Sequence, residues 1–394
     1  MLFLRSIQLQ GLLSFAPASE PIQLTSLNVL IGPNASGKSN LIEAISILQA
    51  LPTSLPNAIR SGGGIQNWLW KGDVGNDLAS IRVHADDDLI GFQTKYAIAI
   101  AEWSQRARVE SEFLSQSLNS AEPEFVAYRL ENGRAQLATV LKGSKKSDTR
   151  ELREIDPKQL NLGESILSQR RDADLFSEIT WLANEFQRIS LFTEWSFGRA
   201  SAVRFPQPAD LPTDYLLSDC TNLGLVLNGM EHEGSISELN ELVGRFLPRF
   251  ERFSTRIVGG TVQIFMHERG LKSPVPATRL SDGTIRFVSL LALMLSRNPP
   301  PVVCIEEPEI GLHPDAIAIL AEVMAGAKER MQLVVTTHSD ALVNALSDDV
   351  ESVLVCEHHG GTVMKRVESG LVQHWLEKYR LGEIWRIGAL GGNP

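Results

Sequence analysis

A glycine-rich loop that ends in Gly-Lys-Ser constrains the fold of this chain more than any other feature of its sequence. It runs from Gly32 to Ser39 and lies between an apolar run at 27–31 and an amphipathic run from Lys38 to about Leu51. This order of strand, GxxxxGKS loop and helix lets backbone N–H groups turn inward around phosphate groups at a helix N-terminus. The loop therefore predicts an α/β domain that binds a nucleotide.

The loop also predicts roles for its side chains. The ammonium group of Lys38 is expected to reach the β- and γ-phosphates, and the hydroxyl of Ser39 to ligate Mg²⁺. The predicted ATP-binding residues are Gly32, Pro33, Asn34, Ala35, Ser36, Gly37, Lys38, Ser39 and Asn40.

Two adjacent carboxylates follow a second apolar strand near the other end of the chain. Residues 302–305 lead into Glu306 and Glu307. Ligands of α/β sheets lie beyond the carboxyl ends of the strands, so we expect Glu306 to hold the metal and Glu307 to act as general base on the attacking water. An acidic pair after a strand is by itself often a solvated turn, but the phosphate loop elsewhere in the chain favours the catalytic interpretation.

Two shorter motifs distinguish this chain from other proteins with phosphate loops. The first, Leu280-Ser281-Asp282-Gly283-Thr284, precedes an apolar helix. The second, Thr336-Thr337-His338-Ser339, follows a β-branched strand at 332–336. Ser281 in the first motif also fits an ordinary helix N-cap, which is compatible with phosphate binding. His338 on its own is equally typical of a loop histidine.

Together these motifs resemble those of a known family. LSDGT resembles the LSGG signature of ABC-type ATPases, His338 resembles their switch histidine, and EEPEIGLHP resembles a Walker B motif followed by a D-loop at Gly311, Leu312 and His313. The order of the motifs is similar to that of the RecF/SMC-like AAA ATPases of bacteria, the group that includes the ATPase half of OLD-family proteins. The resemblance covers about the first 100 and the last 130 residues.

The resemblance implies a Mg²⁺-dependent ATPase whose site is completed by a second copy of the chain. ATP would lie between the phosphate loop of one subunit and the signature of the other, where Ser281 and His338 contact the γ-phosphate, and ATP binding would form a homodimer. Glu306 stands where the family often has Asp, and His313 replaces the D-loop aspartate. Gln66 and Gln93 are candidates for the glutamine that contacts Mg²⁺.

The implied fold class is α/β, an ABC/SMC-type P-loop head with a mixed sheet flanked by helices. We expect residues 1–101 and 265–394 to form this head, and residues 102–264, which are more charged and irregular, to form a largely helical inserted lid or arm with an unknown target. The basic stretch at 142–153 fits a solvated loop better than a nucleic-acid contact. The tail from Gly370 to Pro394 carries Trp375 and Trp385, which close the edge of the core or contact a partner.

Composition limits the remaining function classes. A formal net charge of −10 gives no support to a protein that coats nucleic acid, although a local basic groove would leave DNA open as a partner. The three cysteines, Cys220, Cys304 and Cys356, are far apart and indicate neither disulfides nor zinc. We find no pattern of a signal peptide or of a membrane span, which favours the cytoplasm.

These observations leave three functions open. The first is an ATP-driven switch in DNA repair, DNA surveillance or anti-phage defence that dimerises around two ATP molecules and acts with a separately encoded effector. The others are an ATP-binding subunit of a transporter and a non-hydrolysing scaffold that dimerises on ATP. Only residues 339–394 follow His338, too few for the TOPRIM nuclease domain of OLD-family proteins, so we expect any nuclease to be a separate chain.

Overall fold

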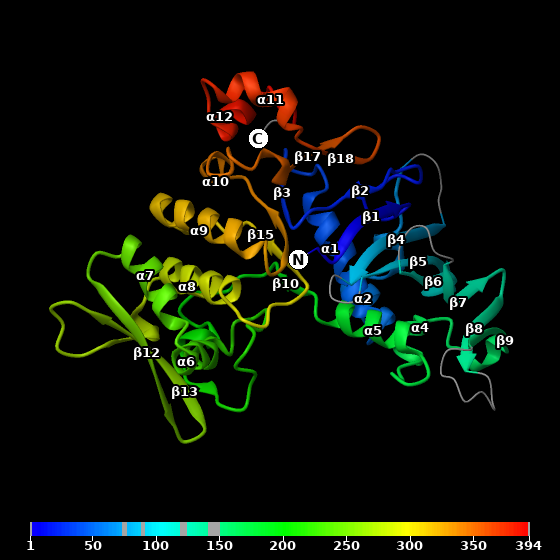
Figure 1. Ribbon diagram of the computed structural model, residues 1–394, viewed down its shortest axis with the longest axis horizontal. Coiled ribbons are helices and arrows are strands. Elements are labelled where there is room, and N and C mark those ends of the chain that lie inside the picture. The colour runs from blue at the N-terminus through cyan, green and yellow to red at the C-terminus, as the bar shows by residue number, and fades with distance from the viewer. Residues whose placement is uncertain (1, 73–76, 88–90, 119–123, 141–149, 393–394) are drawn as a thin grey trace. The chain divides into compact units, whose positions relative to one another are not determined.

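The computed structural model describes residues 2–72, 77–87, 91–118, 124–140 and 150–392, and the chain forms two compact units (Figure 1). Unit 1 comprises Met1–Ile189, Leu354–Arg366 and Gly391–Pro394, and unit 2 comprises Ser190–Val353 and Val367–Leu390. Both units are therefore assembled from segments that are distant in the sequence.

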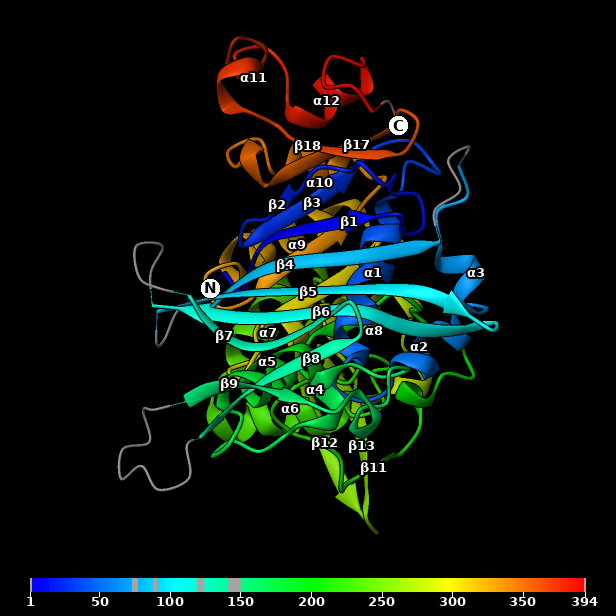
Figure 2. The ribbon, with the colours of Figure 1, turned by 90° about the vertical axis from the view of Figure 1, so that its right-hand side faces the viewer.

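An eight-stranded antiparallel sheet dominates unit 1 (Figure 2). Its order is β2-β1-β4-β5-β6-β7-β8-β9. Alternate residues of β4, such as Ile81 and Val83, are buried, as expected for a strand with one face on a core. The strands are β1 (Leu4–Gln10), β2 (Ile22–Gln23), β4 (Leu78–Asp87), β5 (Phe92–Trp103), β6 (Arg106–Ser117), β7 (Phe125–Glu131), β8 (Arg134–Val140) and β9 (Arg150–Ile155).

Unit 1 also holds the strand that leads into the phosphate loop. Every residue of β3 (Leu27–Ile31) is buried, and the chain passes from it through the loop into α1 (Lys38–Ala50). α1 buries Leu41, Ile45 and Leu48 and contacts α2 and α5. The other elements are β17 (Val353–His358), β18 (Thr362–Arg366), α2 (Leu55–Ser61), α3 (Ile65–Trp68), α4 (Ile166–Gln169) and α5 (Ser177–Gln187).

Unit 2 contains parallel strands and a separate small sheet. β10 (Ser190–Phe192), β15 (Val302–Glu306) and β16 (Gln332–Thr336) are parallel neighbours in this order. The small sheet contains β11 (Gln207–Pro208), β12 (Phe250–Val258), β13 (Thr261–Glu268) and β14 (Val275–Pro276). The two glycines between β12 and β13 have φ of 58° and 77°, which suits the tight hairpin there.

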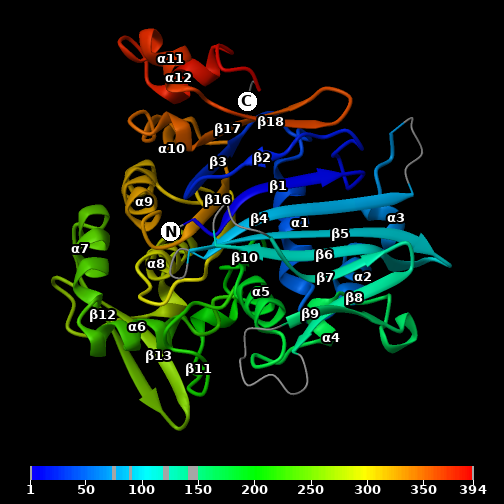
Figure 3. The same ribbon diagram turned by 45° about the vertical axis from the view of Figure 1, so that its right-hand side comes forward.

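The helices of unit 2 pack on these strands and on one another. α8 contacts α6, α7 and α9, and Figure 3 shows α8 beside α9. The α-helices of unit 2 in the described residues are α6 (Leu223–Glu233), α7 (Ile236–Phe246), α8 (Asp282–Met294), α9 (Pro314–Ala327), α10 (Asp340–Asn344), α11 (Ser369–Leu376) and α12 (Leu381–Arg386). Among the described helices, none is long and apolar enough to span a bilayer.

The predicted α/β character and the elements around the motifs are confirmed. The strands at 27–31 and 332–336 have the expected bounds, because short buried apolar runs are strong local signals. In the tail, Trp385 is fully buried whereas Leu371 is 68% exposed, so Trp385 belongs to the core of its unit.

The region 102–264 differs from the largely helical insertion that the sequence suggested. It carries β6 to β9 as well as α4 to α7, and β5 pairs with β6 across the expected boundary at residue 102. Ser104 and Gln105 make this turn with φ of 50° and 65°, a conformation that normally calls for Gly or Asn, so the sequence held no turn signal. Most of the basic stretch, residues 141–149, lies outside the described residues, and Arg150 to Arg153 belong to β9.

Candidate functional site

The backbone of the phosphate loop needs glycine at both of its ends. Gly32 has a φ of 146° and Gly37 a φ of 97°, and Gly37 is the N-cap residue of α1. A Cβ at Gly32 would overlap the carbonyl oxygen of Cys356 on β17, and one at Gly37 would overlap the hydroxyl of Thr362 on β18. Both conformation and close approach therefore exclude larger residues.

A chain of hydrogen bonds fixes the loop from outside the motif. The Thr362 hydroxyl donates to the Ser36 carbonyl (3.0 Å) and lies 2.6 Å from the Ser14 hydroxyl, which accepts from Asn40 Nδ2 (2.6 Å). Sequence reasoning included Asn40 but missed Ser14 and Thr362. Thr362 is separated from Ser36 by 326 positions, and no local pattern could indicate such a contact.

The polar groups inside the loop suit an anion. Lys38 is buried, and its Nζ donates to the carbonyls of Gly32 (2.8 Å) and Pro33 (2.9 Å), so the ammonium lies within the loop. The hydroxyl of Ser36 is buried without a hydrogen-bond partner among the described residues. Ser39 is exposed at the start of α1. A cation, an unsatisfied hydroxyl and a helix N-terminus favour a bound phosphate group.

Glu307, the predicted base, and His338, predicted to contact the γ-phosphate, lie close together in unit 2. Glu306 ends β15 and pairs in register with Thr336, the last residue of β16. Glu307 follows with a φ of 45°, and its N–H donates to the Thr336 carbonyl (3.0 Å). Its Oε1 lies 3.7 Å from Nε2 of His338. Left-handed backbone at a glutamate is strained, and such strain is found where a side chain is held for function.

Glu309, the last carboxylate of the EEPE run, holds the histidine segment. Its Oε1 accepts from the Thr337 hydroxyl (2.6 Å) and from the His338 N–H (3.0 Å). No role was predicted for Glu309 from the sequence. Its position two residues after the expected base was the available signal.

Arg286 of α8 also supports the turn at Glu307. Its Nη1 donates to the Glu307 carbonyl (3.2 Å), and its guanidinium lies over the rings of Trp195 (5.5 Å) and Phe197 (5.7 Å). Burial lowers the pKa of Arg286, and the negative charges of Glu309 and Glu307 oppose that shift. The charge is thus partly desolvated beside the expected base, a role that sequence reasoning missed.

The signature residues form the start of α8. Ser281 is its N-cap: the side chain accepts from the Thr284 N–H (3.0 Å) and lies 2.7 Å from the Thr284 hydroxyl. Leu280 is buried, whereas Ser281 and Asp282 are exposed. The alternative of a helix cap is therefore confirmed, and it leaves the helix N-terminus open toward solvent.

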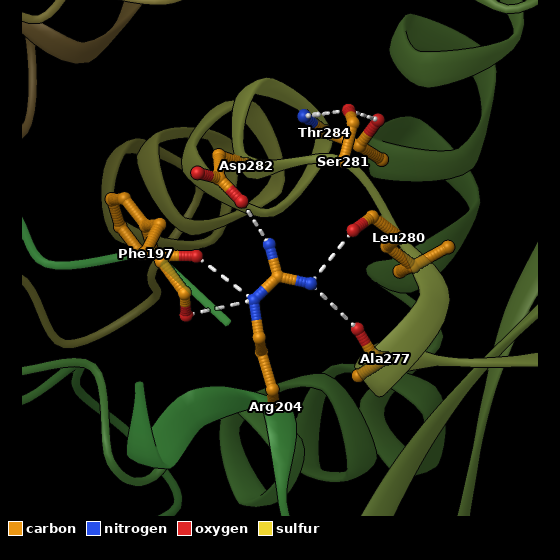
Figure 4. A network of polar contacts seen from close by, with 8 residues as sticks. Phe197, Arg204, Ala277, Leu280, Ser281, Asp282 and Thr284 are labelled. Carbon is orange, nitrogen blue, oxygen red and sulfur yellow. Dashed lines mark hydrogen bonds and ion pairs between the residues drawn. The ribbon is translucent and has the colours of Figure 1, made fainter. Parts of the chain in front are cut away.

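A buried arginine that sequence reasoning missed fixes this segment (Figure 4). Arg204 is 4% exposed, and its Nη1 donates to the carbonyls of Ala277 (3.1 Å) and Leu280 (2.7 Å). Its Nη2 donates to the carboxylate of Asp282. No motif marked it, because its partners in the signature segment lie 73, 76 and 78 residues away.

The D-loop residues pack against the signature in the same unit. Gly311 has a φ of 76°, and a Cβ on Gly283 would lie 2.5 Å from the Gly311 carbonyl oxygen. Leu312 N–H donates to the Glu309 carbonyl (3.0 Å). His313 is the N-cap of α9: its Nδ1 accepts from the Asp315 N–H (3.2 Å).

The side chains expected to bind Mg²⁺ carry oxygen donors, which suit a hard cation whose other ligands are phosphate and water. The Ser39 hydroxyl and the Glu306 carboxylate are each oxygen donors of the kind that Mg²⁺ prefers, and their role as ligands stays a prediction. The part of the chain that the structure describes has no cluster of three or more His, Cys, Asp or Glu that could hold a metal alone. Gln66 donates to Glu102 and Gln93 lies on β5, and the role of either in metal binding stays a prediction.

Comparisons with solved structures identify the fold. An SMC head bound to the C-winged helix domain of ScpA superposes with a TM-score of 0.57 at 14% identity over 93% of this chain and 99% of that one. An SMC head from Pyrococcus furiosus, with an extended coiled coil and bound to the C-terminal domain of ScpA, gives 0.55 at 14% identity over 96% and 99%. An SMC head from Pyrococcus yayanosii gives 0.52 at 11% identity over 96% and 99%.

Sequence comparison gives the family. No curated protein matches the chain significantly. A family model described as "AAA domain, putative AbiEii toxin, Type IV TA system" matches residues 27–344, from the strand before the phosphate loop to the end of α10. This chain, with its SMC-head fold, is therefore a member of that AAA family, of the RecF/SMC-like type that its motifs resemble.

Proposed function

We propose that this protein is a Mg²⁺-dependent ATP phosphohydrolase that works as a molecular switch and dimerises around two ATP molecules. The observation that carries the proposal is the pair of Glu307 and His338, 3.7 Å apart at the ends of two parallel strands, in a chain whose GKS loop holds its lysine inside an anion-binding cradle. In phosphoryl transfer, a catalytic base or water-positioning residue orients the attacking group toward the γ-phosphate, which is the role that this pair would serve.

Each chain supplies both halves of a composite site in this proposal. The signature of each chain acts on the nucleotide of the partner. The nucleotide of the same chain is bound and hydrolysed by Lys38, Ser39, Glu306, Glu307 and His338. Ser281 and Asp282 are exposed at the N-terminus of a 13-residue helix, where backbone N–H groups favour phosphate oxygen. Two-fold symmetry then gives two identical sites per dimer.

We further propose a role in DNA repair, DNA surveillance or anti-phage defence, in the cytoplasm and with a separately encoded effector. The AbiEii toxin and type IV system in the family description favour defence among these. SMC heads of the same fold are seen bound to domains of ScpA, which supports a protein partner. DNA as a partner stays open, since the net charge of −10 gives it no support.

The region 102–264 remains our candidate for target recognition. β6 to β9 continue the large sheet of unit 1, so deleting the whole region would cut through that sheet. Local changes are therefore the suitable test, and the exposed Ile257 and Val258 at the β12–β13 hairpin are one place to begin.

Size-exclusion chromatography with light scattering tests the dimer. Glu307→Gln removes the base but keeps its shape, so with Mg²⁺ and ATP it should bind nucleotide and accumulate as a dimer with two ATP molecules. Lys38→Ala should stay monomeric under the same conditions. A monomeric Glu307→Gln at saturating ATP would refute the composite site. Turnover measured with and without DNA separates the switch from a non-hydrolysing scaffold.

A further inference from the structure

Two buried or half-buried arginines lie at the start of α8, Arg204 against its N-terminal segment and Arg286 within the helix, and they contact different functional segments. Arg204 bonds to the segment just before and at the signature, namely the carbonyls of Ala277 and Leu280 and the carboxylate of Asp282. Arg286 bonds to the carbonyl of Glu307, the expected base. All these residues belong to unit 2.

The contacts of Arg204 leave its guanidinium little freedom. Besides the signature segment, its Nε donates to the carbonyls of Phe197 (2.8 Å) and Gly198 (3.1 Å), and its side chain is 2% exposed (Figure 4). Each of its three nitrogens is thus bonded. A lysine has three donors on a single atom and cannot reproduce this planar fork.

Arg204 cannot touch a nucleotide itself, because it is buried and its nitrogens face protein oxygens. Its effect must pass through the residues that it holds, since Leu280 and Asp282 lie on either side of the exposed Ser281. Arg286 is likewise committed to protein groups, because its guanidinium lies over Trp195 and Phe197.

From this division we infer that the two arginines serve different nucleotides of the dimer. Arg204 is a positioning residue that sets the signature for the ATP of the partner, whereas Arg286 is a positioning residue that sets the base for the ATP of its own chain. The inference rests on the proposed composite site. It adds two residues that no motif contains and assigns to each the site on which it acts.

Mixing inactive variants tells the two roles apart. When Arg204→Gln is mixed with Lys38→Ala, both defects of a heterodimer fall on one site and the other is intact. When Arg204→Gln is mixed with Ser281→Arg, each site carries one defect. For Arg286→Gln the pattern reverses: the mixture with Ser281→Arg leaves one intact site, and the mixture with Lys38→Ala leaves none.

The expected recovery follows from random pairing. Each heterodimer has one intact site of two, so the rate should reach about a quarter of that of the wild-type protein when half of the chains are in heterodimers, and at most about half of it when homodimers do not form. The mixture of Lys38→Ala with Ser281→Arg is the reference. Failure of that mixture would refute the composite site itself, whereas its recovery makes the arginine mixtures decisive.

Folding of the variants is checked separately. Arg204→Gln should bind ATP as the wild-type chain does, because the phosphate loop lies in unit 1. If that variant does not fold, Arg204→Lys is used in the same mixtures, and partial activity of the lysine variant alone is expected. Arg199→Gln removes an exposed arginine close in sequence and should leave turnover unchanged.

Recovery of Arg204 variants with Lys38→Ala, and of Arg286→Gln with Ser281→Arg, would establish the assignment. Recovery of an Arg204 variant with Ser281→Arg instead would place its effect on the nucleotide of its own chain and overturn the inference. Loss of ATP binding by a folded Arg204 variant would overturn it as well, as would full activity of Arg204→Gln alone.

Discussion

Three carboxylates, Glu306, Glu307 and Glu309, lie within four residues at the end of β15, and the structure separates their roles sharply enough to predict which one is the base. Glu307 Oε1 faces His338 Nε2 at 3.7 Å. Glu309 Oε1 is already occupied by the Thr337 hydroxyl and the His338 N–H. We therefore expect Glu307→Gln to abolish turnover and Glu309→Gln to lower it far less.

The expected magnitudes follow from these contacts. Loss of a general base costs about 10² to 10⁴ in rate, equivalent to about 3 to 5 kcal/mol of transition-state stabilisation. In Glu309→Gln the amide oxygen can still accept both hydrogen bonds of Oε1. The substitution removes the negative charge of Glu309. Its loss weakens the two hydrogen bonds and removes one of the two carboxylates that oppose the pKa shift of Arg286. We therefore expect turnover to fall by less than about tenfold.

Steady-state phosphate release with saturating Mg²⁺ and ATP measures both variants, and equilibrium ATP binding serves as the control for folding. Glu309→Ala, which removes both hydrogen bonds to the histidine segment, should lose much more activity than Glu309→Gln. Equal loss in Glu307→Gln and Glu309→Gln with ATP binding intact would refute the assignment of the base, as would a normal rate for Glu307→Gln.

Three further predictions concern other parts of the molecule. Lys38→Ala should abolish ATP binding or hydrolysis, since the ammonium offsets phosphate charge, and undiminished turnover would remove the loop from the mechanism. Gly283→Ala should lower turnover while ATP binding persists, because the added methyl meets the Gly311 carbonyl at a cost of about 1–3 kcal/mol; Gly326→Ala, with open space around it, is the control, and equal rates for the two would contradict this contact. Burial raises the pKa of Glu112 to about 6 despite hydrogen bonds from Tyr96 and Ser165. This carboxyl is more basic when folded, so its contribution to stability is full below pH about 4.5 and is lost as the pH rises through about 6, a change of about 2 kcal/mol. Thermal unfolding of Glu112→Gln should therefore show a flatter pH dependence than the wild type across that interval, and parallel curves would refute it.

The motif residues could be predicted from sequence because their signals are local. A GKS loop between a buried strand and an amphipathic helix, or two glutamates after an apolar run, involves residues within about 25 positions of each other. The turn between β5 and β6 shows where local signals fail. Ser104 and Gln105 adopt positive φ without glycine, because the pairing of two 12-residue strands outweighs the local preference.

The α/β class, the phosphate loop, the acidic pair and the order of the motifs could be predicted from the sequence, since each depends on backbone conformation and burial over a short span. Which side chains support them depends on the packing of the folded chain. Thr362 reaches the loop from 326 positions away, and Arg204 bonds to carbonyls 73 and 76 positions ahead of it. Such contacts depend on how distant segments pack, and a backbone carbonyl accepts a hydrogen bond whatever its side chain, so the partners of Arg204 leave no mark in the sequence.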